Sequence, residues 1–134
     1  QRPHGSAWLC GYPADEQADT CRLYEEYASL GVGQLELGQD MGWDYPMTAM
    51  NATRLGEPEK AVGALLMDKR TNTYLLNGHN YQDGRLRCYL PGNGGLLTAV
   101  ALMCAGWDGC EVKNPGFPQD GTWDVRWEGL KPMP

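Results

Sequence analysis

The strongest constraint on the fold is the apolar stretch "LLTAVALMCAG", residues 96–106. Nearly every residue in it is apolar, whichever side of a helix it would occupy. A helix that is apolar on all sides has to be buried. The stretch therefore predicts an interior helix that ends at Gly106, and other elements of the chain must cover it.

Three further segments carry helical signals. Residues 13–31 open with proline and aspartate, repeat apolar residues at helical spacing and end at a glycine. The segments 43–56 and 57–67 each have a proline in the first turn, and only the short corner "LGEP" separates them. They predict a helical hairpin, and the fold class is mainly α.

The chain has 134 residues, the usual size of one domain. We expect a single domain with an N-terminal extension (1–12), helical hairpins (13–106) and a tail (107–134). The polar connection before the last helix contains the turn dipeptides Asn77-Gly78 and Asp83-Gly84. A connection of this length is either functional or holds short elements of its own.

The tail changes its period from that of a helix to that of a strand. Trp123, Val125 and Trp127 alternate with charged residues. This alternation predicts a half-buried β-strand at the C-terminal end. A single strand is not stable alone, so it must pair with another segment of this chain or with another chain.

Composition excludes several classes of protein. The net charge is −6, so the basic surface that a nucleic-acid partner requires is missing. No run of eighteen apolar residues is present, which argues against a membrane span.

The first residue is Gln1 and the triplet "NAT" at Asn51 is a glycosylation sequon. We therefore expect a processed, extracellular protein.

Five cysteines give the chain an odd number of thiols. None of them has the C-x-x-C spacing of a structural zinc site, so no metal is expected. At least one disulfide is a reasonable expectation. The locally plausible pairs are Cys10 with Cys21, and Cys104 with Cys110.

The glycine-rich segment "PGNGG", residues 91–95, precedes the apolar helix. It matches neither the G-x-G-x-x-G pattern nor a Walker loop, and no strand of a βαβ unit leads into it. Nucleotide binding is therefore not expected, and the segment predicts a tight turn before the helix. Asn93 in this turn either caps the helix or points into a pocket.

Candidate site residues gather in two places. Glu36, Asp40 and Asp44 are spaced by four residues, and Trp43 and Tyr45 flank the last of them. Two carboxylates across a cleft are what glycoside hydrolysis requires, and an exposed aromatic ring beside them suits a sugar. The alternative is that these carboxylates are solvated, that Asp44 caps a helix and that Trp43 is a core residue.

The second group is the segment "NGHNYQ", residues 77–82. It offers the side chains of His79 and Asn80, together with a second asparagine and a glutamine. Neutral donors and acceptors of this kind suit the recognition of hydroxyl groups. A lone histidine in a loop is otherwise an ordinary hydrogen-bonding residue.

The segments "GMGWDYPMTAMNATRLGEPEKAVGALL" and "TYLLNGHNYQDGRLRCYLPGNGGLLTAVALM" together resemble consecutive parts of the six-hairpin (α/α)6-toroid glycoside hydrolases. The closest pattern is that of the family 95 α-L-fucosidase and galactosidase enzymes. The resemblance covers roughly residues 33–130. It implies a partial toroid, an inner barrel helix after the glycines, and a tail that enters a following β-sandwich.

Two departures from that family bear on activity. Pro91 stands where the resembling enzymes carry a functional aspartate, whereas their asparagine corresponds to Asn93. The general acid of these enzymes lies in an earlier hairpin, and a complete toroid needs about twelve helices where the sequence predicts four. The chain is therefore expected to be either a C-terminal part of a larger glycosidase or a reduced homologue.

The sequence thus predicts a carbohydrate-active glycoside hydrolase without a cofactor. Its pocket carboxylates are expected to be Glu36 and Asp40. The alternative is a secreted module on the same helical scaffold that binds carbohydrate, or has a structural role, without catalysis. The expected partners are a carbohydrate and other segments of a larger polypeptide; the predicted substrate-binding residues are Trp43, Asp44, His79, Asn80 and Asn93.

Overall fold

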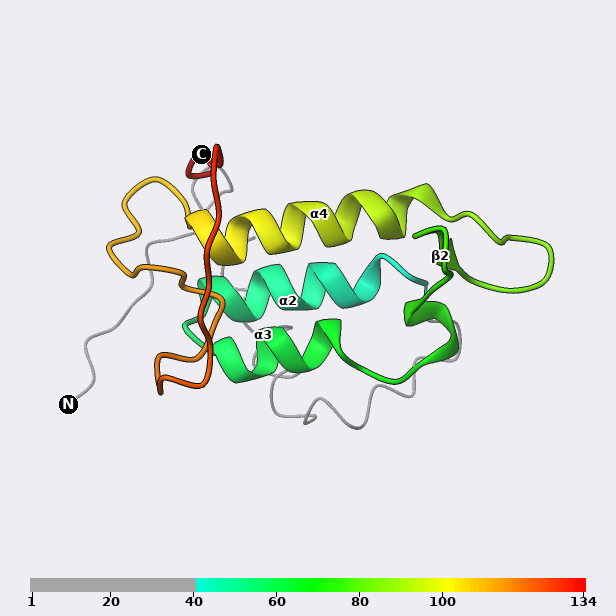
Figure 1. Cartoon of the computed structure of the whole chain (residues 1–134), viewed down its shortest axis with the longest axis horizontal. Coiled ribbons are helices and arrows are strands. Elements are labelled where there is room, and N and C mark those ends of the chain that lie inside the picture. The colour runs from blue at the N-terminus through cyan, green and yellow to red at the C-terminus, as the bar shows by residue number, and fades with distance from the viewer. Residues whose placement is uncertain (1–40) are drawn as a thin grey trace, which may run out of the picture. The chain divides into compact units, whose positions relative to one another are not determined.

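The computed structural model of the chain describes residues 41–134, which belong to one compact unit, Leu37–Pro134. This region is mainly helical, as predicted, with one short hairpin of strands (Figure 1). The predicted extension 1–12, the predicted helix 13–31 and the cysteine pair Cys10 and Cys21 lie outside the described residues. The elements are α2 (Asp44–Arg54), α3 (Pro58–Leu65), the 3-10 helix η1 (Arg70–Asn72), β1 (Thr73–Tyr74), β2 (Asn80–Tyr81) and α4 (Leu90–Ala105).

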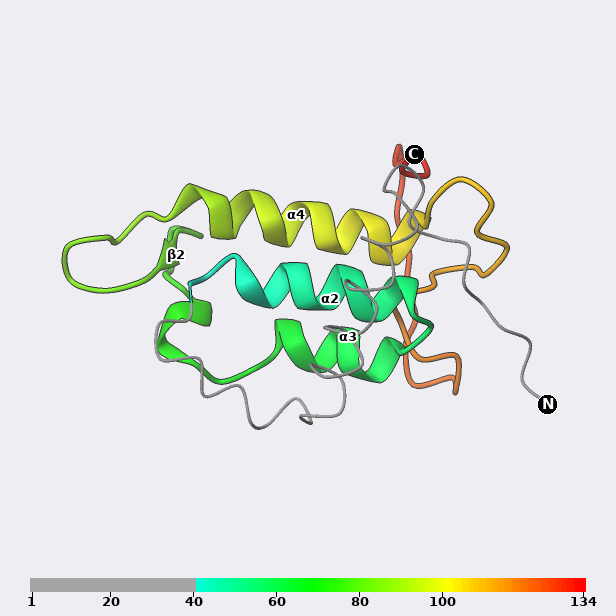
Figure 2. The same ribbon diagram turned by 180° about the vertical axis from the view of Figure 1, so that it is seen from behind.

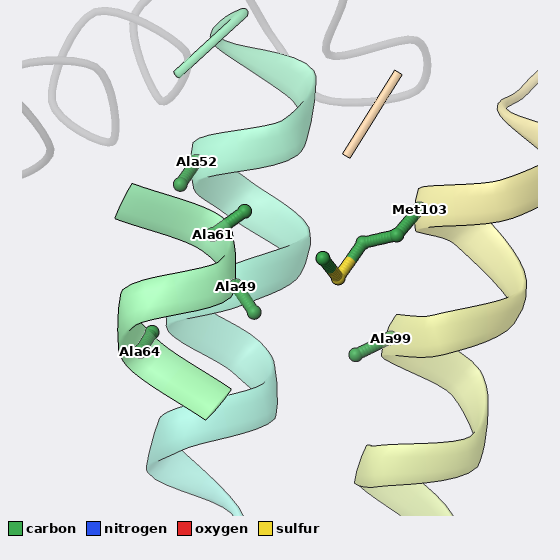
Figure 3. Packing of buried hydrophobic residues seen from close by; sticks show 6 residues of the cluster. All are labelled: Ala49, Ala52, Ala61, Ala64, Ala99 and Met103. Atoms are coloured by element: carbon green, nitrogen blue, oxygen red, sulfur yellow. The ribbon is translucent and has the colours of Figure 1, made fainter. Parts of the chain in front are cut away.

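Helix α2 lies between α3 and α4, as the views from the front and from behind show (Figures 1 and 2). The core between these helices consists mostly of alanines, and a single methionine extends from α4 into it (Figure 3). Small side chains let helix axes approach closely, and the flexible methionine fills the remaining space. The buried cluster is Ala49, Ala52, Ala61, Ala64, Ala99 and Met103.

The predicted hairpin of α2 and α3 is confirmed, and its corner has a defined hydrogen-bond pattern. The N–H of Gly56 donates to Thr53 O at 3.1 Å, and the N–H of Glu57 donates to Ala52 O at 2.9 Å. These two bonds form a Schellman motif, which requires a left-handed residue after the helix. Gly56 supplies it with a φ of 72°.

Replacing Gly56 with alanine should lower the free energy of unfolding by about 1 kcal/mol, because a Cβ is disfavoured in the left-handed conformation. Apart from Gly56 itself and its two chain neighbours, no atom lies within 4 Å of the place that the alanine Cβ would take, so the loss would come from the backbone conformation alone. Urea denaturation measures it. Gly84→Ala is the control, since that glycine also faces open space and has no left-handed φ. Equal losses in the two variants would contradict this explanation.

The glycines before the last helix do not form a turn, so that prediction is wrong. Helix α4 begins at Leu90 and includes the whole "PGNGG" segment, with Pro91 in its first turn. Local preference favours a turn here because glycine weakens a helix interior. Close packing explains two of the glycines instead: a Cβ on Gly92 would collide with Asn80, and one on Gly95 would lie 2.8 Å from Pro46 Cγ.

The expectation that the apolar helix is buried on all sides is also only partly met. Ala99, Leu102 and Met103 are fully buried against the rest of the unit. On another side of α4, Leu90 is 68% exposed and Leu97 is 73% exposed. Within the described residues, α4 packs against α2 and the loops, which cover only part of its circumference.

The long connection before α4 holds short elements, which was one of the two expectations. Strands β1 and β2 pair antiparallel, with Thr73 opposite Tyr81 and Tyr74 opposite Asn80. The predicted turn at Asn77-Gly78 joins them, and Gly78 has a φ of 83°. At the second predicted turn, Asp83 Oδ1 accepts hydrogen bonds from the N–H groups of Arg85 and Leu86, at 2.7 and 2.9 Å.

The tail folds back over the C-terminal end of α4 and then runs nearly straight (red in Figures 1 and 2). The N–H of Gly116 donates to Met103 O at 3.0 Å, and Trp107 forms an isolated bridge with Met133. The strand predicted around Val125 is absent, because no segment among residues 41–134 pairs with it.

The predicted disulfide between Cys104 and Cys110 is not formed, and both thiols are free. Cys104 is buried in α4, and its burial raises the pKa of the thiol. Cys110 lies beyond the glycine turn and its Sγ donates to Val112 O at 3.7 Å. In the described part of the chain, no helix is both long and apolar enough to cross a membrane.

Candidate functional site

Two buried amide side chains organise the end of the unit where α2 and α4 begin. Asn80 is 0% exposed and Gln82 is 4% exposed. Buried amides are costly unless each donor and acceptor has a partner. Both residues follow the hairpin turn, so their partners decide how that turn is attached to the helices.

Both amide hydrogens of Asn80 are used by protein groups. Its Nδ2 donates to Thr71 O at 3.1 Å and to Thr73 O at 3.3 Å. Its Oδ1 accepts a hydrogen bond of 2.7 Å from Gln82 Nε2. Asn80 therefore holds the hairpin against η1 and leaves no amide hydrogen for a ligand.

Gln82 extends this network to the start of α2. Its Nε2 donates to Thr71 O at 3.0 Å as well as to Asn80. Its Oε1 accepts the N–H of Gly42 at 2.8 Å. A side chain on Gly42 would occupy the position of the Asn80 carboxamide, so this close approach requires glycine.

Asn93 links the first turn of α4 to the same hairpin. Its Oδ1 accepts the N–H of Asn80 at 2.9 Å, and its Nδ2 donates to Gly78 O at 2.7 Å. It does not cap α4, whose N-cap residue is Tyr89 and has no side-chain hydrogen bond. Asn93 is half-buried and holds the tip of the hairpin in place.

Trp43 and His79 are the exposed members of the predicted site. Trp43 immediately precedes α2 and is 44% exposed. His79 is exposed at the hairpin, where its N–H donates to Asn77 Oδ1 at 3.1 Å. Each is the chain neighbour of a residue in the buried network, Gly42 for Trp43 and Asn80 for His79. The network therefore fixes the backbone beside both side chains.

Asp44 is the first residue of α2 and not its cap, so the predicted capping role is wrong. Its Oδ2 accepts the N–H of Met41 at 2.8 Å. A carboxylate in the first turn of a helix also interacts favourably with the helix dipole. Asp44 is half-buried, and these interactions account for its position without a ligand.

Glu36 and Asp40, the predicted catalytic pair, lie outside the described residues. Among the predicted site residues, the structure brings Asn80 and Asn93 into direct contact. It places Trp43 and His79 on the adjoining loops and Asp44 at the start of α2. Two pKa shifts occur nearby. Burial raises the pKa of Tyr74, whose hydroxyl donates to Gly92 O at 3.4 Å, and the N–H groups of Leu86 and Arg85 lower the pKa of Asp83.

The sequence did not single out Thr71 as part of this arrangement, and it counted Gln82 only as one of the neutral donors and acceptors in "NGHNYQ". Thr71 O accepts hydrogen bonds from both buried amides, and Thr71 Oγ1 lies 3.0 Å from the hydroxyl of Tyr45. The density of amides in "NGHNYQ" was a visible signal, but it does not reveal which of them are buried. Only the fold separates Asn80 from the exposed Asn77.

A shallow pocket of about 150 Å³ lies in the tail, away from this network. The rings of Phe117 and Trp123 contact each other there with a centroid distance of 5.3 Å. Gln119 Nε2 donates to three main-chain oxygens, so its amide nitrogen stabilises the loop. The pocket is lined by Asn114, Phe117, Pro118, Gln119, Gly121, Trp123 and Val125.

Among residues 41–134, no group of three or more histidine, cysteine, aspartate or glutamate side chains is placed to hold a metal ion. Comparisons of the sequence with protein-family models, with curated proteins and with solved structures give no match. The functional argument therefore rests on the residues and their geometry.

Proposed function

We propose that the chain is part of a carbohydrate-active glycoside hydrolase of the six-hairpin type, as a C-terminal part or a reduced homologue. The observation that carries the proposal is the exposed indole of Trp43 on a loop held by a rigid network of amides. An exposed aromatic ring on a fixed backbone suits the apolar face of a sugar ring. His79, on the adjoining hairpin, offers ring nitrogens to hydroxyl groups.

The uncovered side of α4 supports the architecture. A helix with Leu90 and Leu97 exposed is expected to pack against a further element. In a toroid of helical hairpins that element would be another hairpin, from another segment of a larger polypeptide. The fold proposal is thus a partial (α/α) toroid in which α4 is an inner helix.

The proposed chemistry needs a carboxylic acid that protonates the leaving oxygen and a carboxylate that activates water. We assign these tasks to Glu36 and Asp40, because among residues 41–134 the only carboxylate of the predicted site is Asp44, which already accepts a hydrogen bond from Met41. An inverting mechanism would place the two carboxylates roughly 6–10 Å apart. No metal or cofactor takes part in this scheme.

A non-catalytic, extracellular carbohydrate-binding module is the second candidate. Pro91 favours it, because this position in the first turn of α4 offers no carboxylate where the resembling enzymes have one. Such a module would keep Trp43 and the amide network. It would bind sugar without cleaving it.

Hydrolysis of aryl α-fucosides, galactosides and glucosides by the 134-residue chain tests the first candidate, and tryptophan fluorescence titration with the free sugars tests binding. For the hydrolase, Glu36→Gln or Asp40→Asn should lower kcat by at least about 100-fold, since general acid–base catalysis contributes that much. Binding should remain in both variants. Binding without any hydrolysis would favour the module instead.

Trp43→Ala should weaken sugar binding by roughly tenfold or more, as expected for a lost aromatic contact. Trp123→Ala is the matched control, because Trp123 is also 44% exposed but lies in the tail. Equal weakening in the two variants would place the sugar elsewhere. The absence of both hydrolysis and saturable binding would contradict both candidates.

A further inference from the structure

The tail contains an extended segment, Trp123 to Glu128, whose main chain forms no ladder with any other segment of residues 41–134. Among residues 41–134, no acceptor receives a hydrogen bond from the N–H groups between Trp123 and Glu128. Within the described part of the chain, Val125 O is the one main-chain group of this segment with a partner, and it accepts from Asn114 Nδ2 at 3.4 Å. Unpaired edges of this kind are templates for pairing with another strand.

The contact with Asn114 determines which edge is open. In an extended chain, the main-chain groups of successive residues point to opposite edges. Since Val125 O points toward Asn114, the N–H and C=O groups of Asp124 and Arg126 point to the opposite edge. Their side chains are also exposed, by 73% and 85% respectively.

The sequence of this segment, "GTWDVRWEG", is nearly symmetrical about Val125. Glycines stand at both ends, tryptophans lie two residues on either side of the centre, and opposite charges flank it. In an antiparallel pair centred on Val125, each Asp124 would face an Arg126. Each Trp123 would face a Trp127, and opposite charges or aromatic rings directly across a pair of strands stabilise it.

We propose that this segment is a homodimerisation strand, which pairs antiparallel with the same segment of a second copy of the chain, Val125 opposite Val125. In this register Asp124 and Arg126 of the two copies exchange main-chain hydrogen bonds across the open edge. All four tryptophans then lie on one face. Within each copy, Trp127 Nε1 stays bonded to Asn114 Oδ1 at 2.9 Å and Trp123 stays against Phe117.

The charges select this partner and this register. In the single copy, Asp124 and Arg126 form an exposed ion pair of 2.7 Å, which contributes little in solvent. Pairing of two copies replaces it with two ion pairs across the strands. A shift of the register by two residues would lose both cross-strand charge pairs and both tryptophan pairs.

Sedimentation equilibrium of the 134-residue chain tests the proposal at concentrations up to about 1 mM, where even a millimolar complex is half populated. The chain should show a concentration-dependent dimer. Asp124→Arg and Arg126→Asp should each weaken it by about tenfold or more, because each places two like charges across the strands. A monomer at every concentration would overturn the proposal.

Mixing the two variants provides the decisive control. Asp124→Arg leaves arginine at both positions, and Arg126→Asp leaves aspartate at both. When one variant pairs with the other, every cross-strand charge pair is attractive, so a heterodimer should form. Neither variant retains the ion pair within one chain, so an intramolecular effect cannot explain the recovery. The doubly exchanged chain, Asp124→Arg with Arg126→Asp, should dimerise as the unaltered chain does.

A dimer that persists in both single variants, or a mixture that stays monomeric, would overturn the proposed strand pairing. Far-UV circular dichroism of each variant checks that the helices are intact. Val125→Pro gives a second, independent measurement. The N–H of Val125, which proline removes, points to the edge that faces Asn114. This substitution should therefore leave the pairing groups of Asp124 and Arg126 in place and weaken the dimer less than either charge reversal.

Discussion

Replacing Asn80 with alanine lowers the free energy of unfolding by about 3 kcal/mol, because buried groups lose their partners and each such loss costs about 1–3 kcal/mol. Thr73 O loses its side-chain donor, and Gln82 Nε2 loses one of its acceptors. The side chain is 0% exposed, so these groups have no contact with bulk water in the folded protein. Urea denaturation monitored by circular dichroism measures the change.

Two further variants separate the hydrogen bonds from the loss of volume. Asn80→Asp keeps the shape of the side chain but turns an oxygen toward the carbonyl groups of Thr71 and Thr73. At neutral pH it should destabilise the protein at least as much as alanine, since it buries a carboxylate oxygen against two carbonyl oxygens. Asn77→Ala is the control, because Asn77 is exposed and accepts only the N–H of His79. A similar loss for Asn77→Ala would contradict the assigned role of Asn80.

Replacing Gly92 and Gly94 with alanine should change the free energy of unfolding in opposite directions. Both lie in the first turns of α4, where alanine is intrinsically favoured over glycine by about 1 kcal/mol. Around Gly94 no atom lies within 4 Å of the added Cβ, so Gly94→Ala should stabilise the protein by up to about 1 kcal/mol. At Gly92 the Cβ meets the carboxamide of Asn80, and the overpacking should produce a net loss of about 2 kcal/mol.

This pair of variants is measured by thermal and urea denaturation under the same conditions. The difference in sign between the two changes in unfolding free energy is more informative than either value. The gain in helix propensity from glycine to alanine is the same in both variants and cancels when they are compared. If Gly92→Ala also stabilised the protein, the close contact between α4 and the hairpin would not exist in solution.

The parts of the fold that the sequence predicted correctly depend on local signals. Gly56 and the prolines near it define the corner between α2 and α3 through backbone conformations that neighbouring residues determine. The predicted start of α4 was wrong because Gly92 and Gly95 are explained by close approach to Asn80 and Pro46, which come from distant parts of the chain. A rule based on neighbouring residues has no access to such contacts.

The same limit applies to the candidate site. The sequence identified Asn80 and Asn93 as polar residues of interest, and the two are in contact through the N–H of Asn80. The sequence did not reveal that the carboxamide of Asn80 is hydrogen-bonded to Thr71, Thr73 and Gln82, because burial is a property of the folded chain. Trp43 and His79 remain predicted ligand contacts, since their exposed side chains are free of that constraint.

The network formed by Asn80, Gln82 and Asn93 has one more consequence, which concerns solution conditions. Carboxamides and peptide groups do not ionise, so no step in this chain of hydrogen bonds gains or loses charge with pH. Salt also screens such neutral bonds far less than it screens ion pairs. The hydrogen bonds of this network, which fix Gly42 beside Trp43 and Asn80 beside His79, should therefore keep their geometry in acidic or saline surroundings, where a network of carboxylates and lysines would have loosened.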